Sequence, residues 1–169
     1  IPLIFLQDVT GFMVGSKSEQ GGIIKDGAKM VNAVANSVVP KFTIITGNSY
    51  GAGNYAMCGK AYDPRLIVAW PWTELAVMGG SQAAKVLLQI QESTLKKTGK
   101  TITDEERKEI LNNITAKYQK QTEPTYAASR LWTDAIIPPT ETRTWISMGI
   151  EAANNAPITE KFNLGVIQV

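Results

Sequence analysis

The feature that most constrains this fold is a buried-type strand that runs into a turn of small residues. Residues 41–46 contain the β-branched and aromatic run Phe42-Thr43-Ile44-Ile45, which favours a buried strand. The turn at residues 47–53 holds three glycines and an alanine, and a short helix is expected to continue through Met57. This strand–turn–helix unit is typical of an α/β fold with parallel crossovers.

The start of that short helix is suited to holding negative charge. The first N–H groups of a helix have no partner within the helix and lie at the positive end of its dipole. Small residues at Gly51, Ala52 and Gly53 allow another group to approach these N–H groups closely. The turn is therefore a candidate site for a bound anion, or for negative charge that forms during a reaction.

The rest of the chain alternates between expected strands and helices. Further strands are predicted at residues 2–9, 66–70, 74–78 and 134–137, and further helices at 23–38, at 79–90, from 103 and after 139. Residues 11–22 are predicted to form a loop, and residues 96–104 a solvent-facing tip. Thr103 and Glu106 fit a capping box. Because no repeat or linker interrupts this order, residues 1–169 are predicted to form a single α/β domain.

Charge and hydropathy exclude several functional classes. The formal net charge of +2 is too small to indicate binding to nucleic acid or an anionic membrane. No apolar stretch reaches the roughly 20 residues that a membrane-spanning helix needs. The apolar residues 1–6 lack a Met and a basic region, so they are interpreted as a core strand instead of a signal peptide. A chain that begins within a strand also suggests a fragment of a longer protein.

Histidine is absent from the whole sequence, and this limits the chemistry available. Its absence excludes Ser-His and Cys-His nucleophilic catalysis and removes the commonest metal ligand. A base must then come from a carboxylate, a lysine, the substrate or a cofactor. Cys58 is the one cysteine, so no internal disulfide forms, and it is expected to be a buried apolar residue.

Three other interpretations of the turn compete with a turn that binds nothing. Residues 51–56 match the dinucleotide pattern G-x-G-x-x-G/A, but four residues separate them from the predicted strand end, and Glu74 begins a strand where the pattern needs it at a strand end. A P-loop ending at Lys60 fails, because Asn54 and Ala61 occupy required positions. Ser49 as a nucleophile has no histidine to activate it.

Five segments, taken together, resemble the C-terminal half of acyl-CoA carboxylase β subunits, the carboxyltransferase subunits. They are residues 8–15, 22–30, 47–57 and 77–84, and residues 132–139 followed by Thr142-Arg143. They occur in family order along nearly the whole chain. The pair Asn54-Tyr55 and the ending at residues 162–166 are most similar to the methylcrotonoyl-CoA type.

This resemblance implies a crotonase-like (ClpP/crotonase) fold of ββα units. It implies that residues 1–169 are the carboxybiotin-binding half of a carboxyltransferase, and that the N-terminal half, which binds acyl-CoA, is absent. It further implies a ligase reaction in which CO2 passes from carboxybiotin to the carbon acid of an acyl-CoA, most readily methylcrotonoyl-CoA. The cofactor serves as base, which agrees with the missing histidine, and the fragment alone is expected to be inactive.

The resemblance also implies roles for individual residues. The main-chain N–H groups of Ala52 and Gly53 would donate to the oxyanion that forms on the ureido oxygen of biotin. Gly11, Phe12, Gly51, Gly79 and Gly80 would shape the biotin pocket, and Tyr55 would influence the choice of acyl group. No metal is expected in this domain.

Partners and location follow from the same resemblance. Biotin would be carried by a partner protein or subunit that includes biotin carboxylase, and β subunits would form a homo-oligomer. The location would be the cytoplasm in bacteria or the mitochondrial matrix in eukaryotes. The alternatives are a domain that only binds biotin or assembles subunits, and a subunit for propionyl-CoA or geranoyl-CoA.

Overall fold

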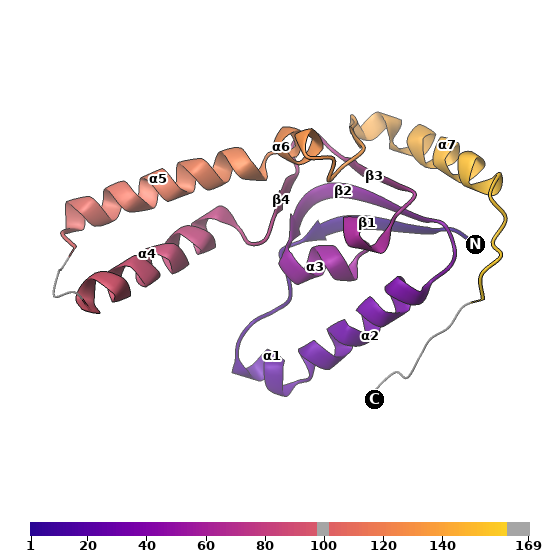
Figure 1. The fold of residues 1–169 in the computed structure, drawn as a ribbon. Helices are drawn as coiled ribbons and strands as arrows, with labels where there is room; N and C mark the ends of the chain where they lie inside the picture. Colours follow the sequence, from indigo (N-terminus) through magenta and orange to yellow (C-terminus); the bar gives the residue numbers. More distant parts are fainter. Residues whose placement is uncertain (98–101, 162–169) are drawn as a thin grey trace.

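A computed structural model describes residues 1–97 and 102–161, and its centre is a parallel sheet of five strands (Figure 1). The strands are β1 (Leu3–Val9), β2 (Lys41–Tyr50), β3 (Leu66–Ala69), β4 (Glu74–Ala76) and β5 (Ala135–Ile136). Their order is β1-β2-β3-β5, and β4 pairs with the second half of β2. All pairings are parallel, which confirms the predicted α/β fold with crossover connections.

The helices surround this sheet and extend beyond it. They are α1 (Ser16–Gln20), α2 (Ile23–Asn36), α3 (Gly51–Ala56), α4 (Gly80–Lys97), α5 (Asp104–Thr122), α6 (Pro124–Ser129) and α7 (Thr142–Asn154), with 3₁₀ turns η1 (Lys60–Tyr62) and η2 (Pro139–Glu141). In Figure 1, α2 and α3 lie on the opposite side of the sheet from α7. The pair α4 and α5 projects away from the sheet as an arm.

The core has two layers because alternate side chains of a strand point to opposite faces. On one face, Ile44 and Val68 pack with Ile137, and residues of α7 cover this cluster. On the other face, Ile45, Ile67 and Ala69 pack with Leu75. The side chains of β2 are buried through its first half, as predicted from the apolar run.

Strand β1 does not belong to this core. It is the edge strand of the described sheet, and Leu3, Ile4 and Leu6 are 40%, 45% and 58% exposed. The prediction of a core strand here is wrong, because an apolar run alone does not distinguish an edge strand from a central one. The residue of β1 that is completely buried is the polar Gln7.

Several element boundaries also differ from the predictions. Strand β2 continues to Tyr50, four residues beyond the predicted end, because residues 48–50 pair with β4. Helix α4 reaches Lys97, and the predicted loop at 11–22 contains α1. Residues 98–101 of the predicted tip and the family-like ending at 162–166 lie outside the described residues.

Helix α5 begins as predicted. The Thr103 hydroxyl accepts a hydrogen bond from the Glu106 N–H, and the Glu106 carboxylate accepts one from the Thr103 N–H. This confirms the capping box. An ion pair of 2.6 Å between Arg107 and Glu92 joins α5 to α4 within the arm. No helix among the described residues is long and apolar enough to cross a membrane.

Candidate functional site

The turn from β2 into α3 requires glycine at position 51. Gly51 has a φ of 54°, in the left-handed region that other residues adopt at a cost. A Cβ atom at this position would also lie 2.8 Å from the main-chain oxygen of Val77. The backbone after β2 therefore approaches the backbone after β4 so closely that a side chain at position 51 would not fit between them.

Gly53 is small for a different reason from the one predicted. The sequence suggested that small residues admit a ligand, but Gly53 is buried, and a Cβ atom there would lie 2.5 Å from Cγ2 of Val9. The Cα of Gly11 lies only 3.2 Å from the same point. Gly53 thus allows α3 to pack on the carboxyl end of β1. The predicted donor residue is also a packing residue.

The first turn of α3 has no side-chain cap. Tyr50 occupies the N-cap position in an extended conformation, and its side chain makes no capping hydrogen bond. The N–H groups of the first helical residues lack partners within the helix by geometry. Ala52 is exposed while Gly53 is buried. Ala52 is therefore the more exposed of the two predicted donor residues.

A buried hydrogen-bond network holds α3 against the two strands beneath it. The Gln7 side-chain amide donates to the carbonyl of Met57 at 2.6 Å and to that of Asn54 at 3.4 Å. Its oxygen accepts from the Ser49 hydroxyl at 2.6 Å, and that hydroxyl accepts from the Asn54 amide at 2.7 Å. Ser49 is completely buried. Its hydroxyl is thus a structural link, in agreement with the rejection of Ser49 as a nucleophile.

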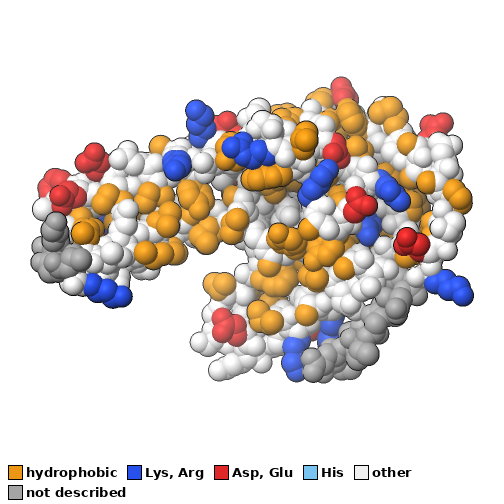
Figure 2. Space-filling model, in the orientation of Figure 1, with side chains coloured by type: hydrophobic (Ala, Val, Ile, Leu, Met, Phe, Trp, Pro, Cys, Tyr) orange, Lys and Arg blue, Asp and Glu red, His pale blue; other side chains and the backbone are white. Residues whose placement is uncertain are grey.

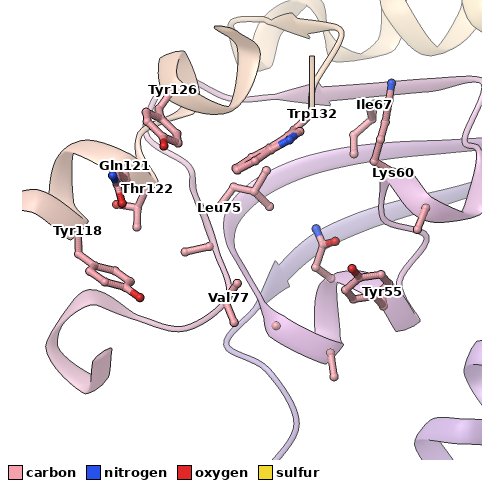
Figure 3. A pocket seen from close by; sticks show the side chains of 15 residues that line it. Tyr55, Lys60, Ile67, Leu75, Val77, Tyr118, Gln121, Thr122, Tyr126 and Trp132 are labelled. Atoms are coloured by element: carbon pink, nitrogen blue, oxygen red, sulfur yellow. The ribbon is translucent and has the colours of Figure 1, made fainter. Parts of the chain in front are cut away.

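A pocket of about 700 Å³ opens beside the first turn of α3 (Figure 3). Its residues come from α3, from η1, from β3, from β4 and the residue after it, and from α5, α6 and the segment after α6. Side chains on its wall include Tyr55, Leu75, Val77, Tyr118, Tyr126 and Trp132. Gly51 and Ala52 also line it. Ligands of open parallel sheets bind at the carboxyl ends of the strands, and Gly51 and Ala52 of the pocket directly follow the carboxyl end of β2.

The aromatic side chains of the pocket hold one another in place. Tyr55 packs edge-on against Tyr62 with ring centroids 6.2 Å apart, and Tyr126 packs similarly against Trp132 at 6.0 Å. Tyr55 and Trp132 remain 52% and 42% exposed, so their faces are available to a ligand. Lys60 also lines the pocket, and its ammonium group lies 3.0 Å from the Asp134 carboxylate.

A second, polar pocket of about 500 Å³ lies next to the start of α4. Gly79 and Gly80 line it, together with Tyr50 and Glu74. The Tyr50 hydroxyl donates a hydrogen bond to the Glu74 carboxylate. Burial raises the pKa of Tyr50, and the hydrogen bond and negative charge of Glu74 raise it further.

The predicted site residues therefore fall into three groups. Gly51, Ala52 and Tyr55 lie together at the first pocket, while Gly79 and Gly80 lie at the second. The other three residues, Gly11, Phe12 and Gly53, line neither. Gly11 lies near Tyr50 and Gly53, and the Phe12 ring packs where a side chain of Gly27 would lie. No metal-binding group of three His, Cys, Asp or Glu residues occurs within residues 1–97 and 102–161.

Sequence reasoning missed several residues of the site and misjudged one argument. In the sequence Gln7 is only a polar residue next to an apolar run, and Tyr118 and Trp132 reach the pocket from distant segments. The spacing argument against a dinucleotide turn is wrong, since β2 runs to Tyr50 and α3 follows at once. The position of Glu74 at the start of β4 still disagrees with that motif.

Cys58 is buried as expected.

The fold and the site together define a mixed α/β protein with a parallel sheet, whose candidate ligand pocket adjoins the turn at the carboxyl end of β2. The chain belongs to the carboxyl transferase domain family, since the model of that family matches residues 1–164. This confirms the family resemblance drawn from the five sequence segments.

Curated relatives give the same assignment. The chain is 50% identical over 165 residues, 97% of its length, to a probable mitochondrial methylcrotonoyl-CoA carboxylase beta chain of Drosophila melanogaster. It is 48% identical over 169 residues, 100% of its length, to the mitochondrial methylcrotonoyl-CoA carboxylase beta chain of Arabidopsis thaliana. It spans 28% and 29% of the length of these two relatives.

Two solved structures share the fold. The β subunit of P. aeruginosa geranyl-CoA carboxylase matches 99% of the chain with a TM-score of 0.82 and 39% identity, and 31% of that subunit is covered. Transcarboxylase 12S, solved with hydrolysed methylmalonyl-coenzyme A bound, matches 100% of the chain with a TM-score of 0.83 and 33% identity. The match again covers 31% of that protein.

Proposed function

We propose that this chain is the carboxybiotin-binding part of the carboxyltransferase of a biotin-dependent acyl-CoA carboxylase, and that the acyl substrate is methylcrotonoyl-CoA. Identities of 50% and 48% to two methylcrotonoyl-CoA carboxylase beta chains support the substrate. The parallel sheet and the TM-scores above 0.8 to two carboxyltransferase structures support a crotonase-like ββα superhelix as the wider fold. The reaction transfers CO2 to the carbon acid of the acyl thioester.

The observation that carries this proposal is the uncapped first turn of α3 at the mouth of an apolar pocket. A pocket of about 700 Å³ is in the range that encloses small cofactors. Its aromatic and aliphatic walls suit a neutral fused ring, and the N–H of Ala52, a residue of the pocket wall, suits its ureido oxygen. The residues present therefore fit biotin. When bound, carboxybiotin supplies both the CO2 and the base for the reaction.

The protein's own contribution is positioning and electrostatic stabilisation. Ala52 lies in the first turn of α3, where the helix dipole favours negative charge, and its N–H would donate to the ureido oxygen. The N–H of Gly53 stays a predicted second donor, although Gly53 lines neither pocket. Loss of one such donor typically costs about 10²–10³ in rate. Exposed faces of Tyr55 and Trp132 would exclude water when a ligand covers them. No histidine is needed for any of these roles.

Partners and location are part of the same proposal. Acyl-CoA would bind mainly to the other half of the carboxyltransferase, biotin would arrive on a carrier subunit, and β subunits would form a homo-oligomer. The mitochondrial names of two eukaryotic relatives support the mitochondrial matrix for a eukaryotic source, with the cytoplasm as its bacterial counterpart. The alternative acyl substrate is geranoyl-CoA, which the match to a geranyl-CoA carboxylase subunit favours.

Hydrogen exchange of the full-length protein, with and without free biotin, tests the binding site. Biotin should slow amide exchange in peptides that cover residues 50–57 and 75–80, while peptides of α7 should not change. Slower exchange in α7 alone, or no change anywhere, would contradict the proposed biotin pocket. Biotin binding without any carboxylation in the assembled enzyme would favour the non-catalytic binding or assembly role.

A further inference from the structure

Gln7 lies where β1, β2 and α3 meet. Its side chain is completely buried, and all its side-chain bonds go to residues 49–57. The oxygen binds the Ser49 hydroxyl on β2, and the nitrogen binds main-chain carbonyls of Asn54 and Met57 at α3 and just beyond it. A buried amide without partners costs free energy, and these hydrogen bonds satisfy both the oxygen and the nitrogen of Gln7.

A bulge in the pairing of β1 with β2 lies next to Gln7 and brings its side chain to Ser49. Gln7 pairs with Ile45 and Val9 pairs with Ser49, so β2 advances four residues while β1 advances two. The Asp8 carboxylate accepts a hydrogen bond from the Asn48 N–H at 2.9 Å, and the Thr46 hydroxyl donates to the Gln7 carbonyl at 3.0 Å. The bulge places the Ser49 hydroxyl on the Gln7 amide, directly before α3 begins.

Ser49 connects Gln7 to α3 through a further hydrogen bond. Its hydroxyl accepts from the Asn54 side chain, while the Gln7 nitrogen is also shared with the Asn54 carbonyl. Asn54 is held at both its side chain and its main chain. Asn54 and its α3 neighbours Ala52 and Tyr55 all line the first pocket.

We propose that Gln7, acting through Ser49 and Asn54, is a positioning residue that sets where the Ala52 N–H and the Tyr55 ring lie in the pocket. This inference rests on the proposed function, because α3 must be placed accurately only if its N–H groups act as oxyanion donors. Catalytic donors must be held close to the productive geometry, and a displacement of about 1 Å can cost on the order of 10² in rate. A network that joins three elements fixes α3 more firmly than helix packing alone.

The test uses the full-length carboxylase assembled with its biotin-carrying partner. Gln7→Met keeps the volume and removes three hydrogen bonds, and Ser49→Ala is the smaller second variant if Gln7→Met fails to fold. Each should lower kcat, on the order of 10²-fold for Gln7→Met, with KM for the acyl-CoA unchanged. Amide exchange should become faster in residues 51–57. Ser49→Thr, which keeps the hydroxyl, should recover activity relative to Ser49→Ala.

Thr142→Val is the matched control, because it removes the 3.0 Å hydrogen bond from the Trp70 indole near α7. It should lower Tm by a comparable amount and leave kcat unchanged. An unchanged kcat in both network variants, or an equal loss in Thr142→Val, would overturn the positioning role. If the wild-type enzyme carboxylates no acyl-CoA, the proposed function fails instead, and unchanged exchange at residues 51–57 in Ser49→Ala would separately overturn the inference.

Discussion

A Cβ atom on Gly51 would lie 2.8 Å from the carbonyl oxygen of Val77. This close approach joins the end of β2 to the end of β4 and places the start of α3 on the pocket wall. The space-filling view in Figure 2 shows apolar side chains gathered along the arm and around the adjoining hollow. The backbone contact at Gly51 thus determines where the proposed oxyanion donors face the ligand.

Gly51→Ala should therefore damage both stability and activity. A left-handed alanine costs about 1–2 kcal/mol, and the clash with the Val77 oxygen must displace main chain as well. We expect carboxyl transfer to fall by about 10² or more, since α3 would shift. Chemical unfolding and initial-rate assays measure the two effects.

Gly79→Ala provides the control for the stability part of that prediction. A Cβ atom at Gly79 would lie 3.7 Å from the Tyr50 ring, an ordinary contact. Its free energy of unfolding should stay within about 0.5 kcal/mol of the wild type. Equal destabilisation by the two substitutions would mean that the contact between Gly51 and Val77 is not the cause.

Tyr55→Ala should change which acyl-CoA is preferred. Tyr55 is half exposed on the pocket wall, and removing its ring enlarges the space beside α3. The ratio of kcat/KM for methylcrotonoyl-CoA to that for a longer acyl-CoA should fall about tenfold. Tyr55→Phe keeps the ring and should leave the ratio unchanged. An unchanged ratio in the alanine variant would remove Tyr55 from the specificity determinants.

The raised pKa of Tyr50 predicts that the free energy of unfolding falls at alkaline pH. Its folded-state pKa is raised by burial and by Glu74, above the value of about 10 expected in the unfolded chain. The folded state therefore binds more protons than the unfolded state above about pH 10, so stability falls as pH rises there. Tyr50→Phe should flatten this decline in urea unfolding between pH 9 and about pH 11. A decline as steep as that of the wild type would rule out Tyr50 as its source.

Thr103→Ala should destabilise α5 by about 1 kcal/mol, because it removes the hydroxyl of the capping box. Thr94→Ala is a matched exposed control, since the Thr94 hydroxyl only donates to a carbonyl within α4. Thermal unfolding of the two variants should separate them by several degrees. Equal Tm values would show that the capping box does not stabilise the arm.

Most of the fold was predictable because apolar periodicity defines strands and helices locally. The extension of β2 was not, since residues 47–50 have turn composition and become a strand by pairing with β4 and, at Ser49, with β1. The exposure of β1 was equally hidden, because strand order depends on contacts between distant segments. The apolar run at residues 1–6 is compatible with a strand at the edge of a sheet and with one at its centre.

The candidate site was predictable in part. Glycines at the β2–α3 turn are visible in sequence, and their family pattern points to main-chain donors. The role of Gln7 depends on a bulge between β1 and β2, and the pocket wall from Tyr118 depends on how α5 returns to the sheet. Such features require three-dimensional register. Tyr55, expected to influence the choice of acyl group, lies on the wall of the first pocket, and that influence stays a prediction.

Carboxylation by the full-length protein, assembled with its biotin-carrying subunit, tests the central claim most directly. The measurement is the ATP-dependent incorporation of labelled bicarbonate into methylcrotonoyl-CoA, geranoyl-CoA and propionyl-CoA. The proposed function predicts the highest kcat/KM with methylcrotonoyl-CoA. Higher activity with either other substrate would contradict the acyl assignment, and no incorporation into any of the three would contradict the carboxyltransferase function itself.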